Sequence, residues 1–322
     1  MAVYTEVSDV ALKGFLTNYD IGTLRSFNGI TEGVENTNYL VHTDIHSYIL
    51  TLYERRVDKN DLPFFLKLLE HLAAHSISCP TPIKSKNGQM LGELSGKPAT
   101  IVSYLEGAWV RRPSPHHCHE VGAALAQLHL AGSDFKMTRA NALGPASWTE
   151  LGRDTANHAD TFTPGLRTEI AADLDNLVRA WPNDLPAGII HADLFPDNVF
   201  FIDDQLSGLI DFYFACHDAF AYDISICLNA WCFEPDNAFN ITKARQLLRA
   251  YENIRPLSRA EYDAIPLLSH GAAMRFLLTR LYDWINTTPN ALVKPKDPAE
   301  YIRKLRFHRS VTSPTEYGLD ER

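Results

Sequence analysis

Two aspartates and an asparagine near the middle of the chain have residue types and a spacing that suit phosphoryl transfer. They lie in His191-Ala192-Asp193-Leu194-Phe195-Pro196-Asp197-Asn198 and, further on, in Ile210-Asp211-Phe212. A carboxylate such as Asp193 can accept the proton of an attacking hydroxyl, and an Asn with an Asp can hold magnesium against nucleotide phosphates. The H-x-D-x-x-x-x-N spacing followed by a strand-turn-strand is specific, whereas H-x-D alone would be a weak signal. The segment therefore predicts an enzyme that moves a phosphoryl group to an alcohol.

Three short apolar segments are predicted to be the strands that position these side chains. The last two form a hairpin, which is expected to bring Asn198, before its first strand, beside Asp211, after its second strand. Both residues would then lie at one end of the sheet, next to the loop that carries Asp193. The three segments are residues 189–190, 199–202 and 206–210, with Asp203-Asp204-Gln205 as the hairpin turn.

The motif from His191 to Asn198, together with Ile210-Asp211, resembles the catalytic core of the aminoglycoside phosphotransferase and choline kinase-like superfamily. The resemblance implies an α+β, bilobal protein-kinase-like fold, with an antiparallel sheet in a small N-terminal lobe and an α-rich C-terminal lobe. It implies ATP and Mg²⁺ as cofactors. Asp193 would be the catalytic base and His191 a support for its loop, while Asn198 and Asp211 would be the metal ligands.

Three further segments, residues 29–39, 48–54 and 274–284, are similar to the homoserine kinases of this fold. This narrower resemblance implies that the small-molecule partners are ATP and L-homoserine, in a step of threonine biosynthesis. We expect a nucleotide-binding lobe over residues 1–106 and a catalytic and substrate lobe over residues 107–309. Residues 310–322 are polar, contain Pro and Gly and lack apolar periodicity, so we expect a disordered tail.

The N-terminal lobe contains a turn-rich loop that can approach phosphates closely. Gly29 and Gly33 permit such an approach, and Asn36 and Asn38 can present hydrogen-bond donors. The pattern predicts a flap over the nucleotide. An ordinary hairpin has the same residue types, so this alternative stays open.

The nucleotide site departs from the protein-kinase pattern at two positions. Thr51 stands where protein kinases keep a lysine that reaches the phosphates, and Phe65 stands where the glutamate partner of that lysine is expected. The joint loss is coherent, because losing one partner alone would leave a buried charge unpaired. The resemblance further implies that backbone between Ser103 and Leu105 hydrogen-bonds the adenine.

The second lobe contains the candidate substrate residues. A helix is expected over about residues 259–268 and another over 269–286, and the latter carries Arg275, Arg280 and Asp283. A guanidinium with an acid can bind a zwitterionic amino acid. Alternatively, these residues form salt bridges within the lobe, and this possibility stays open. By resemblance, Asp223 caps the helix that follows it and braces the catalytic loop.

Bulk composition restricts the partners. A net charge of −9 argues against nucleic acid or an anionic membrane as a partner, and no apolar run is long enough to span a bilayer. The five cysteines are odd in number and scattered, which is typical of reduced thiols in a cytoplasmic protein. Both a monomer and a homodimer are compatible with the sequence.

Two other functions stay open from the sequence. A kinase of the same fold could act on choline, an aminoglycoside, methylthioribose or hydroxylysine, although mixed Arg and Asp in the 269–286 helix suits an amino acid better. The absent lysine and glutamate also raise the alternative of a nucleotide-binding pseudokinase, against which the intact Asp193, Asn198 and Asp211 argue.

Overall fold

The chain folds into two compact units. The computed structural model describes residues 4–30, 36–54, 58–287 and 294–321. One unit contains Met1–Gly107 with Ser207–Tyr213, and the other contains Ala108–Leu206 with Phe214–Arg322. From the sequence we expected a single boundary after residue 106. The structure differs because the later stretch Ser207–Tyr213 belongs to the first unit.

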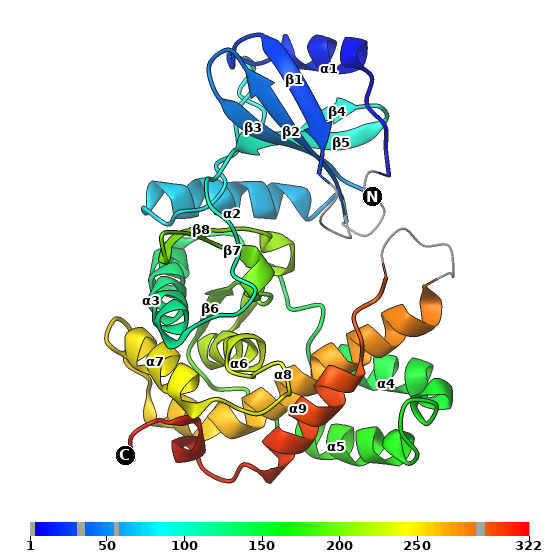
Figure 1. Ribbon diagram of the computed structural model, residues 1–322, viewed down its shortest axis with the longest axis vertical. Helices are drawn as coiled ribbons and strands as arrows, with labels where there is room; N and C mark the ends of the chain where they lie inside the picture. The colour runs from blue at the N-terminus through cyan, green and yellow to red at the C-terminus, as the bar shows by residue number, and fades with distance from the viewer. Residues whose placement is uncertain (1–3, 31–35, 55–57, 288–293, 322) are drawn as a thin grey trace. The chain divides into compact units, whose positions relative to one another are not determined.

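The first unit is built on the antiparallel sheet that the sequence predicted (Figure 1). Its strands run in the order β1-β2-β3-β5-β4, so that β3 lies at the centre between β2 and β5. The strands are β1 (Leu24–Gly29), β2 (Thr37–Thr43), β3 (Ser47–Leu52), β4 (Gly92–Leu94) and β5 (Lys97–Ser103).

Side-chain alternation divides this sheet into two different faces. Leu50 of β3 pairs with Tyr39 of β2 and Ile101 of β5, and all three are buried in one apolar cluster. Helix α1 (Asp9–Leu16) contributes Leu12 and Phe15 to the same cluster. Because successive strand residues point to opposite faces, the neighbouring residues of these strands face away from the cluster.

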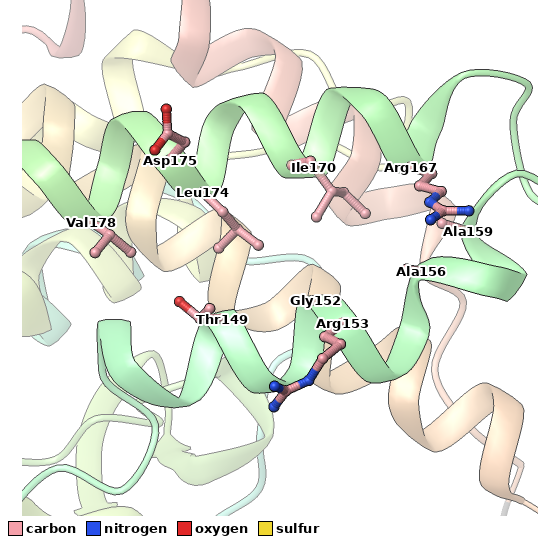
Figure 2. A pocket seen from close by; sticks show the side chains of 11 residues that line it. Thr149, Gly152, Arg153, Ala156, Ala159, Arg167, Ile170, Leu174, Asp175 and Val178 are labelled. Carbon is pink, nitrogen blue, oxygen red and sulfur yellow. The ribbon is translucent and has the colours of Figure 1, made fainter.

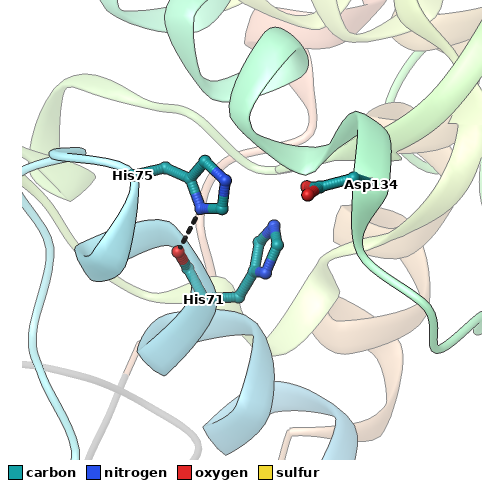
Figure 3. Close-up of side chains that lie close together, drawn as sticks. All are labelled: His71, His75 and Asp134. Atoms are coloured by element: carbon teal, nitrogen blue, oxygen red, sulfur yellow. Dashed lines mark hydrogen bonds between the residues drawn. The ribbon is translucent and has the colours of Figure 1, made fainter.

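Helix α2 (Leu62–Ala74) follows β3 in the chain. Pro63 lies in its first turn, where a missing N–H is tolerated. His75 is the C-cap of the helix, and its ring Nδ1 lies 2.9 Å from the carbonyl oxygen of His71, a contact drawn in Figure 3. The same carbonyl oxygen accepts the backbone N–H of His75 at 3.2 Å, so the ring adds a second contact to the last turn of the helix.

The second unit is rich in helices, as expected (Figure 1). Two of its helices, α4 and α9, were not anticipated from the sequence. No helix among the described residues is long and apolar enough to cross a membrane. The helices are α3 (Pro115–Ala131), α4 (Pro145–Ala159), α5 (Leu166–Ala180), α6 (Phe220–Trp231), α7 (Ile241–Glu252), α8 (Arg259–Asn286) and α9 (Ala299–Ser310). The short strands are β6 (Ala187–Ile190), which pairs with β9 (Cys216–Ala219), and β7 (Val199–Ile202), which pairs with β8 (Gln205–Leu209).

Helix α8 is one helix of 28 residues, whereas the sequence predicted two. Its interior contains Pro266, which removes one intrahelical hydrogen bond. Ile265 and Leu268 flank the proline and are fully buried, so packing keeps the helix continuous there. A capping box between Ser258 and Glu261 fixes its start.

The C-terminal tail is folded over residues 310–321, whereas the sequence led us to expect disorder over residues 310–322. Residues Pro314–Tyr317 form a short 3₁₀ turn, called η4. The Tyr317 side chain is fully buried, and its hydroxyl lies 2.7 Å from Nδ1 of His308. Val311 and Leu319 are buried as well, and a capping box between Ser313 and Glu316 fixes the turn. These scattered anchors have no apolar periodicity.

Candidate functional site

The loop between β6 and β7, residues 191–198, is entered through an unusual backbone conformation. Ile189 and Ile190 are buried in β6, as predicted. Two residues later, Ala192 has φ +62°, in the left-handed region that non-glycine residues rarely adopt. The loop ends in a short 3₁₀ turn, Pro196–Asn198, that leads into β7.

Asp223 of α6 holds the start of the 191–198 loop. Its carboxylate accepts the backbone N–H of His191 at 2.7 Å and that of Ala192 at 2.9 Å, and His129 Nε2 lies 3.1 Å away. Burial raises the pKa of Asp223, but the hydrogen bonds and charges of His129 and His191 together keep the pKa below its ordinary value. The predicted brace is therefore present. The predicted cap is wrong, because α6 begins after Ala219 without a side-chain cap.

The carbonyl groups of the same loop are held by three other side chains. Arg275 donates to the oxygen of Ala192 at 2.6 Å, and the Asn198 amide donates to that of Asp193 at 2.8 Å. Trp231 Nε1 donates to the oxygen of Leu194 at 2.7 Å. Together with Asp223, these contacts fix the backbone on both sides of Asp193. No local sequence signal identified Arg275 or Trp231 as loop partners.

Asp193 and Asn198 are brought together as the motif predicted. The Asn198 amide nitrogen also lies 3.3 Å from Oδ2 of Asp193. Because both bonds use the nitrogen, the amide oxygen of Asn198 keeps its lone pairs for a hard cation. His191 is fully buried, and its Nδ1 accepts the N–H of Asp193 at 3.3 Å. The role of His191 as a support for the loop stays a prediction.

Asp211 also has a left-handed backbone, with φ +63°, and its side chain is exposed. The β7–β8 hairpin that precedes it forms as predicted, with positive φ at both Asp203 and Asp204 of the turn. Asp211 belongs to the first unit, whereas Asp193 and Asn198 belong to the second. The convergence of the three side chains on one metal stays a prediction.

An aromatic cluster surrounds Phe65, the residue at the expected glutamate position. The ring of Tyr213 lies 5.6 Å from that of Phe65 and 5.6 Å from that of Tyr53, edge to face in both cases. Phe65 is 1% exposed and Tyr53 is 2% exposed. Apolar and aromatic contacts therefore fill this part of the unit, in keeping with the loss of a lysine-glutamate pair.

Thr51 forms a neutral contact at the expected lysine position. Its hydroxyl donates to Oδ1 of Asn38 at 2.7 Å, across the β2–β3 pair. Thr100 of β5 lies opposite Thr51 on the other side. These three residues share the sheet face that points away from the α1 cluster. The bond leaves the amide N–H groups of Asn38 as donors on that face.

The predicted flap is only partly described. Gly29 is the last residue of β1 and is exposed, while Gly33 lies outside the described residues. Asn36 is 4% exposed, and its Oδ1 accepts the backbone N–H of Glu54 at 3.2 Å. The Asn36 side chain thus supports the sheet, which differs from the expected role as a phosphate donor.

The predicted adenine-binding backbone follows β5. The N–H of Ser103 donates to the carbonyl of Thr81 at 2.9 Å, and the Ser103 hydroxyl accepts from the N–H of Thr81 at 2.9 Å. The N–H of Ser103 is therefore engaged within the first unit. Of the predicted pair, Leu105 is the residue whose N–H stays a candidate for the adenine.

The two arginines proposed to bind substrate are both engaged by the protein. Arg275 is 1% exposed and bonded to Ala192, and Arg280 pairs with Glu300 of α9 at 2.6 Å. The sequence left open the alternative that these arginines form ion pairs within the lobe. Arg280 does so, through Glu300. Asp283, further along α8, is partly exposed.

A cavity of about 530 Å³ lies between α4 and α5, as Figure 2 shows. Its lining includes apolar residues such as Ile170 and Leu174, with Arg153 and Arg167 at its edges. None of the residues predicted to act in phosphoryl transfer lines it. The cavity is therefore separate from the 191–198 loop.

Solved structures of other proteins share this fold. An amicoumacin kinase solved with AMP-PNP and Ca²⁺ matches with a TM-score of 0.68 at 17% identity, covering 94% of this chain and 92% of its own. Choline kinase from Cryptosporidium parvum matches with a TM-score of 0.69 at 13% identity, covering 94% of each chain. These likenesses confirm the predicted protein-kinase-like fold.

Sequence relatives identify the family. The model of the phosphotransferase enzyme family matches residues 26–257. A protein of Parvibaculum lavamentivorans named homoserine kinase is 63% identical over 320 residues, covering 99% of this chain and 100% of its own length. Another of that name, from Agrobacterium fabrum, is 59% identical and covers 99% of both chains. The chain therefore belongs to the phosphotransferase enzyme family, among full-length relatives that carry the name homoserine kinase.

Proposed function

We propose that this protein transfers the γ-phosphate of ATP to the side-chain hydroxyl of L-homoserine, which yields O-phospho-L-homoserine for threonine biosynthesis. The observation that carries this proposal is the 63% identity to a homoserine kinase along 99% of the chain. The geometry of the 191–198 loop supports it, because the loop presents a carboxylate on a backbone that several side chains fix.

Asp193 is the proposed catalytic base. It orients the substrate hydroxyl and accepts its proton, late in a reaction whose transition state is loose. The side chain is partly exposed, so that a substrate can approach it. His191 keeps the loop in shape through the hydrogen bond to the Asp193 N–H and takes no proton from the substrate.

Asn198 and Asp211 are the proposed ligands of Mg²⁺. An amide oxygen and a carboxylate are the hard oxygen donors that this ion prefers, and the bonding of the Asn198 nitrogen leaves its oxygen for that purpose. When bound, the ion neutralises charge on the nucleotide phosphates. The two side chains would supply part of the octahedral oxygen shell that magnesium prefers.

For ATP, we propose that Asn38 donates to the phosphates, with Thr51 fixing the orientation of its amide. Gly29 would allow close approach at the end of β1, and the N–H of Leu105 would bind adenine. Solved proteins of this fold have been found with AMP-PNP and with ADP, which supports a nucleotide site of this kind. Asp283 is the remaining candidate partner for the ammonium group of the amino acid.

An ADP-release assay tests the function directly. The protein is offered homoserine, serine, choline, methylthioribose and kanamycin in turn, with ATP and magnesium. Release of ADP that depends on homoserine, with phosphohomoserine identified by mass spectrometry, is the expected result. Turnover with another alcohol would replace the proposed acceptor, and silence with all five would favour a pseudokinase.

A further inference from the structure

Ala192, directly before the proposed base, has a backbone conformation that an L residue avoids. Its φ is +62° and it is 1% exposed. In this region Cβ approaches the following carbonyl oxygen, which raises the free energy of any residue except glycine. Because Asp193 is the next residue, the direction of its carboxylate depends on whether Ala192 keeps this conformation.

Two buried side chains hold Ala192 from opposite sides. Oδ1 of Asp223 accepts its N–H at 2.9 Å, and Nη1 of Arg275 donates to its carbonyl oxygen at 2.6 Å. The N–H belongs to the peptide group before Ala192, and the carbonyl belongs to the peptide group after it. Each bond holds one of the two peptide groups, so both bonds are needed to restrict φ and ψ of Ala192 together.

Arg275 depends on this contact as much as the loop does. The side chain is 1% exposed, and its guanidinium lies 4.6 Å from the ring of Phe276 and 5.7 Å from that of Phe214. Its Nε has no hydrogen-bond partner within the described part of the chain. A buried charge that loses an acceptor is strongly destabilised, so the bond to the Ala192 carbonyl is difficult to break.

We propose that Arg275 is a positioning residue. Through its bond to the Ala192 carbonyl it keeps Ala192 in the left-handed conformation, which sets the direction of the Asp193 carboxylate. This inference rests on the proposed role of Asp193 as the base. It assigns to Arg275 a role in turnover and none in substrate binding. The N–H side of Ala192 stays fixed by Asp223, so loss of Arg275 loosens the loop without unfolding it.

The test compares Arg275→Met, which keeps the bulk but removes the donors, with Arg275→Lys, which keeps one charged donor. For Arg275→Met, kcat is expected to fall about 10- to 100-fold, with KM for ATP and for homoserine within about twofold of the wild type. For Arg275→Lys, kcat should fall about 3- to 10-fold, to a value between those of the wild type and Arg275→Met. Wild-type kcat in Arg275→Met, or an increase in KM alone, would overturn the proposal.

A rescue variant separates positioning from general destabilisation. Glycine adopts the left-handed region without strain, so adding Ala192→Gly to Arg275→Met should restore kcat about three- to fivefold. Leu248→Ala, at a buried position of α7, serves as a control with a comparable loss of thermal stability and an unchanged kcat. Failure of the rescue, or an equal loss of kcat in Leu248→Ala, would contradict the proposed role.

Hydrogen exchange at the amides of residues 191–193 provides a readout that needs no acceptor. In Arg275→Met these amides should exchange at least about tenfold faster than in the wild type. In Leu248→Ala their exchange rates should be unchanged. If the wild type does not phosphorylate homoserine, the proposed function fails while this comparison still decides the role of Arg275. Unchanged exchange in Arg275→Met would refute it.

Discussion

The hydroxyl of Thr51 donates a 2.7 Å hydrogen bond to the side-chain oxygen of Asn38 on the neighbouring strand. Protein kinases keep a lysine at the position of Thr51. A neutral pair therefore lies on β2 and β3 of the sheet in the first unit, and it leaves the amide N–H groups of Asn38 as donors.

Removing that bond tests whether the pair serves ATP. In Thr51→Val the Asn38 amide loses its anchor, so we expect KM for ATP to rise about two- to fivefold and unfolding to become easier by about 1 kcal/mol. Thr51→Ser keeps the hydroxyl and should behave like the wild type. Steady-state kinetics measure KM for ATP, and urea unfolding measures the stability. An unaltered KM for ATP in Thr51→Val would show that the Thr51–Asn38 bond has a structural role only.

The metal ligands can be tested through the magnesium requirement. Asn198→Ala removes a proposed ligand together with the bond to the Asp193 carbonyl, so half-maximal activity should need about 10- to 100-fold more magnesium. Asn176→Ala, at an exposed asparagine of α5, is the matched control. A magnesium titration that is identical for wild type and Asn198→Ala would exclude Asn198 as a ligand.

The local parts of the site could be read from the sequence. The strand before the loop, the hairpin after it and the Asp193–Asn198 contact all depend on residues close in the chain, whose spacing fixes their geometry. The loop partners Arg275 and Trp231 could not be read in this way. They lie 83 and 37 residues from the groups they contact, and only the packing of whole helices brings them there.

Elements held by tertiary contacts were also misjudged. The sequence predicted two helices, over residues 259–268 and 269–286, yet buried neighbours keep α8 continuous through Pro266. The tail looked disordered because it has no apolar period, although Tyr317 contacts His308 and both Val311 and Leu319 are buried. Arg275 and Arg280 looked like substrate ligands by residue type, and burial shows that both already have protein partners.

The packing of α3 on α7 predicts a severe effect at one glycine. A Cβ at Gly122 would lie 2.1 Å from the backbone oxygen of Leu247, which cannot move without shifting α7. Gly122→Ala should therefore lower the free energy of unfolding by at least about 2 kcal/mol. Gly14→Ala in α1, where nothing lies within 4 Å of the added methyl, should instead stabilise by about 0.5–1 kcal/mol. Thermal denaturation compares the two; equal melting temperatures would disprove the close contact.

The Glu54 carboxylate predicts an acid-sensitive contribution to stability. Burial raises the pKa of Glu54, but the 2.8 Å ion pair with Lys97 and the hydrogen bonds of Thr5 and Thr37 lower it below its ordinary value of 4.5. Since the folded pKa is depressed, the stabilisation is complete at neutral pH. It is lost as the pH falls below about 4.5 through the folded pKa, because the unfolded chain binds the proton first.

Glu54→Gln should remove this pH dependence. The variant is expected to be less stable than the wild type at pH 7, and the difference should shrink steadily between about pH 5 and pH 3. Urea unfolding at closely spaced pH values measures it. A constant difference across this range would show that the carboxylate charge of Glu54 does not contribute.

The single-turnover rate of Asp193→Asn with homoserine tests the central claim most directly. The substitution keeps the shape of the side chain and removes its basicity, so the phosphoryl-transfer rate should fall by at least about 10²-fold. The affinity for ATP, measured by calorimetry in the same samples, should stay within about twofold of the wild type. A transfer rate near that of the wild type would contradict the assignment of Asp193 as the base and, with it, this account of catalysis.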